Sequence, residues 1–127
     1  MNKFLVVCAC CLTINCSSYF TLKTAMEIYK KTTIDKVNIS RVNDGTYVGY
    51  YDMLLVNALV RATVKDGILV KLVLLEHKYD GKHDGSAVVQ QILKKQSLEV
   101  DGITGSTQSC RSILKATERA LKTGLGG

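Results

Sequence analysis

A tight turn between two strand-like segments constrains the fold more than any other feature of the sequence. Asp66-Gly67 favours the two-residue turn of a β-hairpin, and it lies between two runs rich in β-branched and apolar residues, Ala58 to Val64 and Ile68 to Leu75. A second turn signal, Asn43-Asp44-Gly45, precedes another strand-like run, Thr46 to Tyr51. The sequence therefore predicts strands joined into an antiparallel sheet.

Helical patterns flank these strands on both sides. In the last of them, Ile113 and Leu121 belong to an apolar face that is spaced to pack on a sheet. Helices combined with an antiparallel sheet give the fold class α+β, with the sheet covered by helices in a single domain. The predicted helices are Thr21 to Lys31, a segment near Ser86 to Lys95, and Gln108 to Lys122.

The composition of the chain limits the classes of partner. A chain of 127 residues with 46% apolar residues can build one hydrophobic core. The net charge is +6, but the lysines and arginines are interleaved with acids and form no basic run with stacking aromatics, which argues against nucleic-acid binding. The positive charge still favours a phosphorylated ligand or anionic lipid head groups.

The N-terminus has the pattern of a secretory signal. Lys3 precedes an apolar stretch, Phe4 to Ile14, which is shorter than the about 20 residues that a membrane-spanning helix needs. The segment around Cys16 resembles a bacterial lipoprotein processing site of relaxed form. Thr13 stands where such sites usually have leucine, and Asn15 stands where they usually have glycine or alanine.

This pattern predicts the first part of the domain organisation. We expect residues 1–16 to be a signal peptide of lipoprotein type, with lipidation at Cys16, and residues 17–43 to be a spacer with a short helix. Lipidation would anchor the protein at the extracytoplasmic face of a bacterial cell membrane; without it the protein would be periplasmic or secreted. Cysteines in an apolar leader without histidine lack a scaffold that orients metal ligands, so we predict no metal site.

A turn of small polar residues, 101–107, stands directly before the last predicted helix. The first turn of a helix leaves backbone N–H groups without partners and carries partial positive charge, so a phosphate there gains hydrogen bonds and a favourable dipole interaction. Gly105 can adopt a positive φ and let the backbone approach a ligand. The alternative is that Thr104, Ser106 or Thr107 serves only as an N-cap.

Several segments, taken in order, resemble the FMN-binding domain family. That family includes the peripheral flavin subunits of the sodium-translocating quinone reductase and of the Rnf electron-transport complex, and many small membrane-anchored flavoproteins. The resemblance implies that residues 44–123 form an FMN-binding domain. The matching segments are Asp44 to Gly49, Val64 to Leu69, Leu75 to His77, Gln96 to Asp101, and Ile103 to Ser109 followed by Ile113-Leu114-x-Ala116.

The resemblance implies that FMN is the cofactor and that its phosphate lies on the turn from Asp101 to Thr107. In many members of the family a flavin transferase esterifies the FMN phosphate to the threonine that corresponds to Thr107. This chain has Ser106 where the family usually has alanine, and the additional hydroxyl could compete as acceptor. Covalent attachment at Thr107 is thus one hypothesis, and reversible binding of FMN is the other.

The resemblance also implies roles for the neighbouring residues. Asp101 would repel a phosphate, so we expect it to brace the turn or to be recognised by the transferase. His77 either meets the isoalloxazine or phosphate of FMN, or is a half-exposed histidine at the end of a strand. The remaining contacts would be backbone donors from Gly105, Ser106 and Gln108 and hydroxyl donors from Thr104 and Ser109.

The function that follows is electron transfer at a membrane. The chemistry would belong to the flavin, because no substrate pocket with its own acid, base or nucleophile is apparent in the sequence. We therefore expect an electron carrier that works with redox partner proteins and is not a self-sufficient enzyme. Two alternatives are a non-covalent FMN-binding module of a membrane redox complex and a flavin-free surface lipoprotein.

Overall fold

The computed structural model describes residues 18–102 and 105–126. The predicted signal peptide with Cys16, and Thr104 of the turn, lie outside these residues. The chain divides into two units between Lys31 and Thr32. In the first unit, residues 18–31 form a helix, which begins three residues before the predicted start at Thr21. Within the described part of the chain, no helix combines the length and the apolar character needed to cross a membrane.

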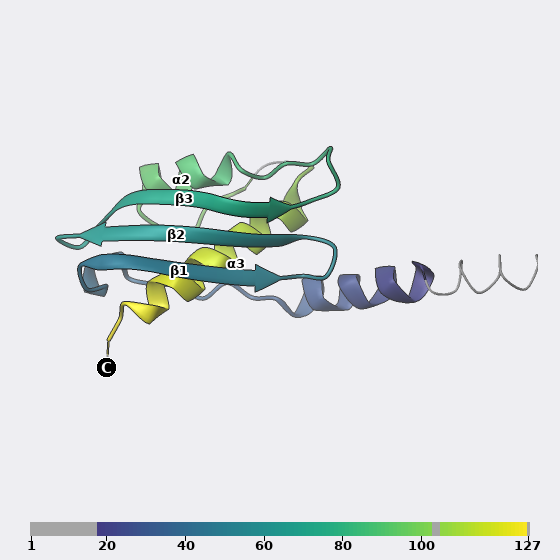
Figure 1. Ribbon diagram of the computed structural model, residues 1–127, viewed down its shortest axis with the longest axis horizontal. Helices are drawn as coiled ribbons and strands as arrows, with labels where there is room; N and C mark the ends of the chain where they lie inside the picture. Colours follow the sequence, from purple (N-terminus) through teal and green to yellow (C-terminus); the bar gives the residue numbers. More distant parts are fainter. Residues whose placement is uncertain (1–17, 103–104, 127) are drawn as a thin grey trace, which may run out of the picture. The chain divides into compact units, whose positions relative to one another are not determined.

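The second unit is built on a three-stranded antiparallel sheet (Figure 1). Its strands are β1 (Gly45–Asp52), β2 (Asn57–Lys65) and β3 (Ile68–Lys78), in the order β1-β2-β3. Lys65 pairs with Ile68, and the two residues between them, Asp66 and Gly67, have φ values of 53° and 75°. Two consecutive positive φ values define the tight hairpin turn that the sequence predicts.

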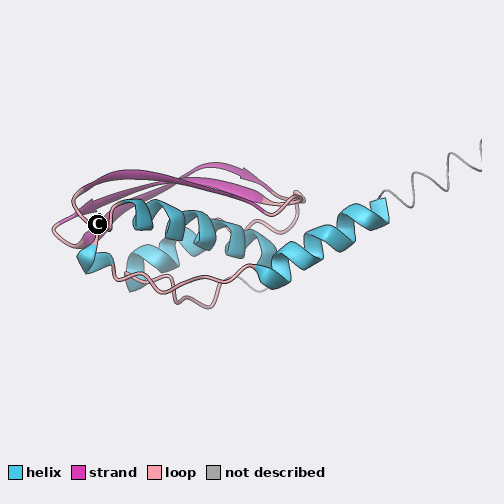
Figure 2. Ribbon diagram, turned by 90° about the horizontal axis from the view of Figure 1, so that it is seen from below, coloured by secondary structure: helices cyan, strands magenta, loops and turns pink. Residues whose placement is uncertain are grey.

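Two helices cover one face of this sheet, α2 (Val88–Lys95) and α3 (Thr107–Thr123), as Figure 2 shows. A short 3-10 helix, η1 (Ile39–Arg41), precedes β1. The structure therefore confirms the predicted α+β class and the predicted order of elements.

The hydrophobic core lies between the sheet and the helices. Alternate residues of β2 point toward the helices, since Ala58, Val60, Ala62 and Val64 are all buried. The segment between Thr32 and β1 also contributes to the core, although the sequence pattern placed it in a spacer. From α3 and from this segment, the core receives Ile113, Ala116, Ala120, Leu121, Val37, Ile39 and Val42.

The backbone of α3 lies very close to the sheet at Gly49 in β1. A Cβ atom built on Gly49 would lie 1.9 Å from the carbonyl oxygen of Ala116 and 2.6 Å from the backbone nitrogen of Ala120. Both neighbouring atoms belong to the helix backbone, which cannot turn aside as a side chain can. Gly49 therefore sets how closely α3 approaches the sheet.

We expect Gly49→Ala to destabilise the protein by about 3 kcal/mol, because the added methyl group would push α3 away from β1. The free energy of unfolding from urea denaturation measures this effect. Val48→Ala is the matched control, since Val48 is 54% exposed on the opposite face of the same strand. Val48→Ala should lower the free energy of unfolding by about 1 kcal/mol or less. Equal stabilities for the two variants would contradict the proposed contact.

Candidate functional site

The residue at the N-cap position of α3 does not use its side chain as a cap. Ser106 occupies the N-cap position, but its side chain makes no capping hydrogen bond, and the first turn contains no acidic residue. The helical ladder begins with the N–H of Cys110, which donates to the Ser106 carbonyl at 2.9 Å. Gly105 has a φ of 85°, the left-handed conformation expected from the sequence. The first turn of α3 therefore places no acidic side chain of its own at the positive end of the helix dipole.

Two cavities meet at Thr107, the exposed first residue of α3. The larger has a volume of about 400 Å³ and the smaller about 270 Å³. Because Thr107 lines both, a group bound to its hydroxyl could reach into either cavity.

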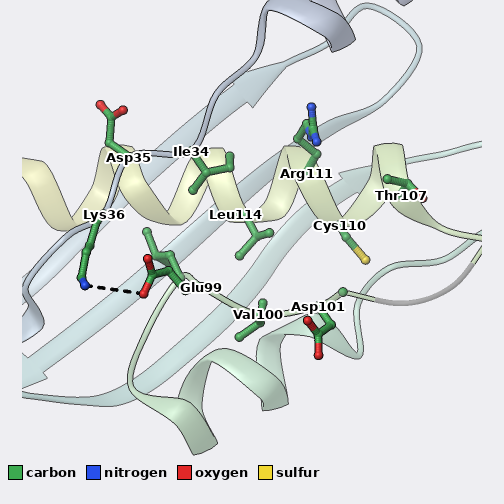
Figure 3. Close-up of a pocket in the computed structure, with 12 residues that line it drawn as sticks. Ile34, Asp35, Lys36, Glu99, Val100, Asp101, Thr107, Cys110, Arg111 and Leu114 are labelled. Atoms are coloured by element: carbon green, nitrogen blue, oxygen red, sulfur yellow. Dashed lines mark ion pairs between the residues drawn. The ribbon is translucent and has the colours of Figure 1, made fainter.

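Apolar side chains from three separate segments enclose much of the larger cavity. Figure 3 shows Ile34, Val100 and Leu114 around it, with Thr107 near one end. Lys36 and Glu99 form an ion pair of 3.7 Å beside it. The remaining lining residues are Asp35, Leu98, Asp101, Gly102, Cys110 and Arg111.

The smaller cavity lies at the start of α3. The turn before the helix and its first residues form one side of this cavity, and the segment after β3 forms another. The complete lining is Val56, Tyr79, Asp80, His83, Gly105, Ser106, Thr107, Gln108 and Ser109.

A partly buried chain of hydrogen bonds attaches the start of α3 to β3. His77 Nδ1 contacts the carbonyl oxygen of Asn57 at 2.7 Å, and His77 Nε2 contacts the hydroxyl of Ser109. That hydroxyl also accepts the N–H of Gly85 at 2.9 Å. In the neutral ring Nδ1 donates to the carbonyl, so Nε2 accepts the Ser109 proton. The Ser109 hydroxyl therefore already has two partners within the protein, His77 and Gly85.

The segment after β3 is ordered by Asp80. One oxygen of its carboxylate accepts the N–H groups of Lys82 at 2.9 Å and His83 at 2.8 Å, and the other oxygen pairs with His83 Nδ1. The hydrogen bond from the His83 side chain is the largest cause that lowers the Asp80 pKa to about 2. Asp80 is therefore ionised at neutral pH.

The wall of the larger cavity is attached to α3 through Glu118, which is 1% exposed. Its carboxylate accepts hydrogen bonds from Lys115 at 3.0 Å and from the backbone N–H of Asp35 at 3.0 Å, and it pairs with Lys122 at 2.8 Å. Burial alone would raise the Glu118 pKa, but the hydrogen bonds from Lys122 and Lys115 outweigh it and lower the pKa. Glu118 thus holds the segment that carries Ile34 against the helix.

The structure brings most of the predicted site residues together. Gly105, Ser106, Gln108 and Ser109 line the smaller cavity, Asp101 lines the larger one, and Thr107 lines both. His77 lies next to Ser109. The sequence analysis did not identify the residues that distant segments contribute, because no local pattern marks them. Those residues are Ile34, Asp35, Lys36, Val56, Tyr79, Asp80 and His83.

Comparison with known proteins identifies a family. The model of the FMN-binding domain matches residues 21–122 of the chain, which include both cavities. No curated protein and no solved structure matches the chain.

We expect Glu118→Gln to lower the free energy of unfolding by about 2 kcal/mol at pH 7, because it removes a buried charge from its lysine partners. Because its pKa is lowered, Glu118 stabilises the folded protein at pH values above its ordinary pKa of 4.5. This contribution is lost as the pH falls through the pKa of Glu118 in the folded protein. Urea denaturation at pH 7 and pH 3 should therefore show a difference between wild type and variant that shrinks at pH 3.

Glu99→Gln is the control for this prediction, since the Glu99 side chain is 65% exposed in its ion pair with Lys36. It should change stability little at either pH. A gap between wild type and Glu118→Gln that persists unchanged at pH 3 would rule out the ionised carboxylate as the stabilising group.

Proposed function

The chain belongs to the FMN-binding domain family, with FMN as its cofactor, and we propose that it is an electron carrier whose FMN phosphate binds at the turn before α3. The observation that carries this proposal is the cavity beside Thr107 at the start of α3, where the N-cap residue Ser106 makes no capping hydrogen bond with its side chain. When bound, FMN supplies the electron-transfer chemistry. The protein binds, orients and shields it.

The turn before α3 fits a phosphate. The first turn of α3 contains no acidic residue. A Cβ built on Gly105 would meet no atom of the described residues within 4 Å, so there is open space beside the backbone. Backbone N–H groups in the first turn of a helix point toward such a space. A dianionic phosphate would therefore gain hydrogen bonds and a favourable dipole interaction there.

The larger cavity suits the isoalloxazine ring. Its volume of about 400 Å³ lies in the range of cofactor pockets, roughly 300 to 1,000 Å³. The side chains of Ile34, Val100 and Leu114 offer apolar surface to a flat aromatic ring system. Thr107 lines this cavity, so the ring system of an FMN whose phosphate is held at Thr107 could reach into the cavity.

Thr107 is the hydroxyl best suited to carry the phosphate ester. Ser106 is 7% exposed, whereas Thr107 is exposed at the start of the helix. A flavin transferase needs access to the hydroxyl that it modifies, and this difference favours Thr107 over Ser106. The additional hydroxyl of Ser106 is therefore no competing acceptor in this proposal.

The proposed location rests on the sequence pattern of residues 1–16. We place the protein at the extracytoplasmic face of a bacterial membrane, anchored through Cys16, where it exchanges electrons with partner proteins. If Cys16 carries no lipid, the protein is periplasmic or secreted.

Coexpression with a flavin transferase tests the proposed attachment. Visible absorbance of the acid-precipitated protein should show flavin in the pellet for wild type and for Ser106→Ala, and none for Thr107→Ala. Ser106→Ala is the matched control, since it removes the adjacent hydroxyl. Release of the flavin from the wild-type protein on precipitation would contradict the ester and indicate reversible binding of FMN. A wild-type protein that takes up no FMN at all would contradict the proposed function.

A further inference from the structure

The smaller cavity contains an ionisable pair, Asp80 and His83, that the function described so far does not use. Both residues line the cavity together with Ser106 and Thr107 at the start of α3. The pair comes from the segment after β3, so two distant parts of the chain meet at this point.

The orientation of the His83 ring is set by the protein. Asp80 holds the backbone N–H and the Nδ1 atom of His83 with its two carboxylate oxygens. With Nδ1 on the carboxylate, the opposite ring nitrogen, Nε2, is the one that can meet a ligand in the cavity. If Nδ1–H donates to Asp80, Nε2 can also donate only when the ring is protonated.

The charges around the cavity indicate which ligand the ring would meet. Among the described lining residues, His83 is the one side chain that can become positive, and Asp80 is the one that is negative at neutral pH. Tyr79 also lines the cavity, and its ring stacks on that of His77 with 5.1 Å between the ring centroids. A protonated His83 would therefore form an ion pair with Asp80 on one side and present a donor on the other.

We propose that His83, positioned by Asp80, is a phosphate-binding residue of the FMN site, where its Nε2–H donates to the same phosphate that the N-terminus of α3 binds. This inference rests on the proposed function. It adds a consequence: the site distinguishes FMN from riboflavin through a side chain as well as through the backbone. The ionised carboxylate of Asp80 would repel the phosphate. The proposal therefore requires that the His83 ring lies between Asp80 and the phosphate.

Binding titrations of the full-length protein, expressed without a flavin transferase, test the inference. The affinities for FMN and for riboflavin are measured by the quenching of flavin fluorescence. His83→Asn should weaken FMN binding by at least about tenfold, the value of one charged hydrogen bond, and leave riboflavin binding unchanged. His83→Arg, which restores a cation, should recover part of the FMN affinity.

Lys82→Ala is the matched control, because it removes a positive charge from the same segment and Lys82 does not line the cavity. It should bind FMN nearly as wild type does. Equal FMN affinities for His83→Asn and wild type would overturn the inference and leave the proposed function intact. Parallel losses of FMN and riboflavin would also overturn it, since they would show that His83 only supports the fold. A wild-type protein that binds neither flavin would overturn the proposed function, and the inference with it.

Discussion

The close packing of α3 against the sheet is the constraint on which the rest of the structure depends. At Gly49 the helix backbone lies so near β1 that even a methyl group would overlap with it. The buried side chains of the helix are small near this contact, at Ala116 and Ala120. They are larger at Ile113 and Leu121, which fill the core. This contact fixes the axis of α3, and the axis determines where its N-terminus emerges.

Buried polar groups then attach other segments to the same helix. Glu118 holds the backbone of Asp35, and Ser109 holds His77 and Gly85. Each of these groups would be costly to bury without partners, so their partners are specified as strictly as the apolar contacts are. As a result, α3 provides a common wall for both cavities, although the opposite walls come from different parts of the chain.

In the proposed FMN site, the two cavities hold different parts of the nucleotide. A phosphate is dianionic and needs donors, whereas an isoalloxazine ring offers a large flat apolar surface. The smaller cavity offers a helix N-terminus and polar side chains, and the larger one offers Ile34, Val100 and Leu114. Thr107 stands where the two environments meet, which is the position that a phosphate ester would require.

The sequence by itself determined the features that depend on neighbouring residues. The turn at Asp66 and Gly67, the alternation of β2, and the start of α3 after Gly105 each follow from local backbone preferences or from side-chain periodicity. Only the tertiary structure decided that the segment before η1 packs on α3, through a bond between Asp35 and Glu118, and that His83 shares a cavity with Thr107. The physical reason is that such contacts join residues far apart in the chain, and their energy depends on a geometry that exists only after α3 has packed on the sheet.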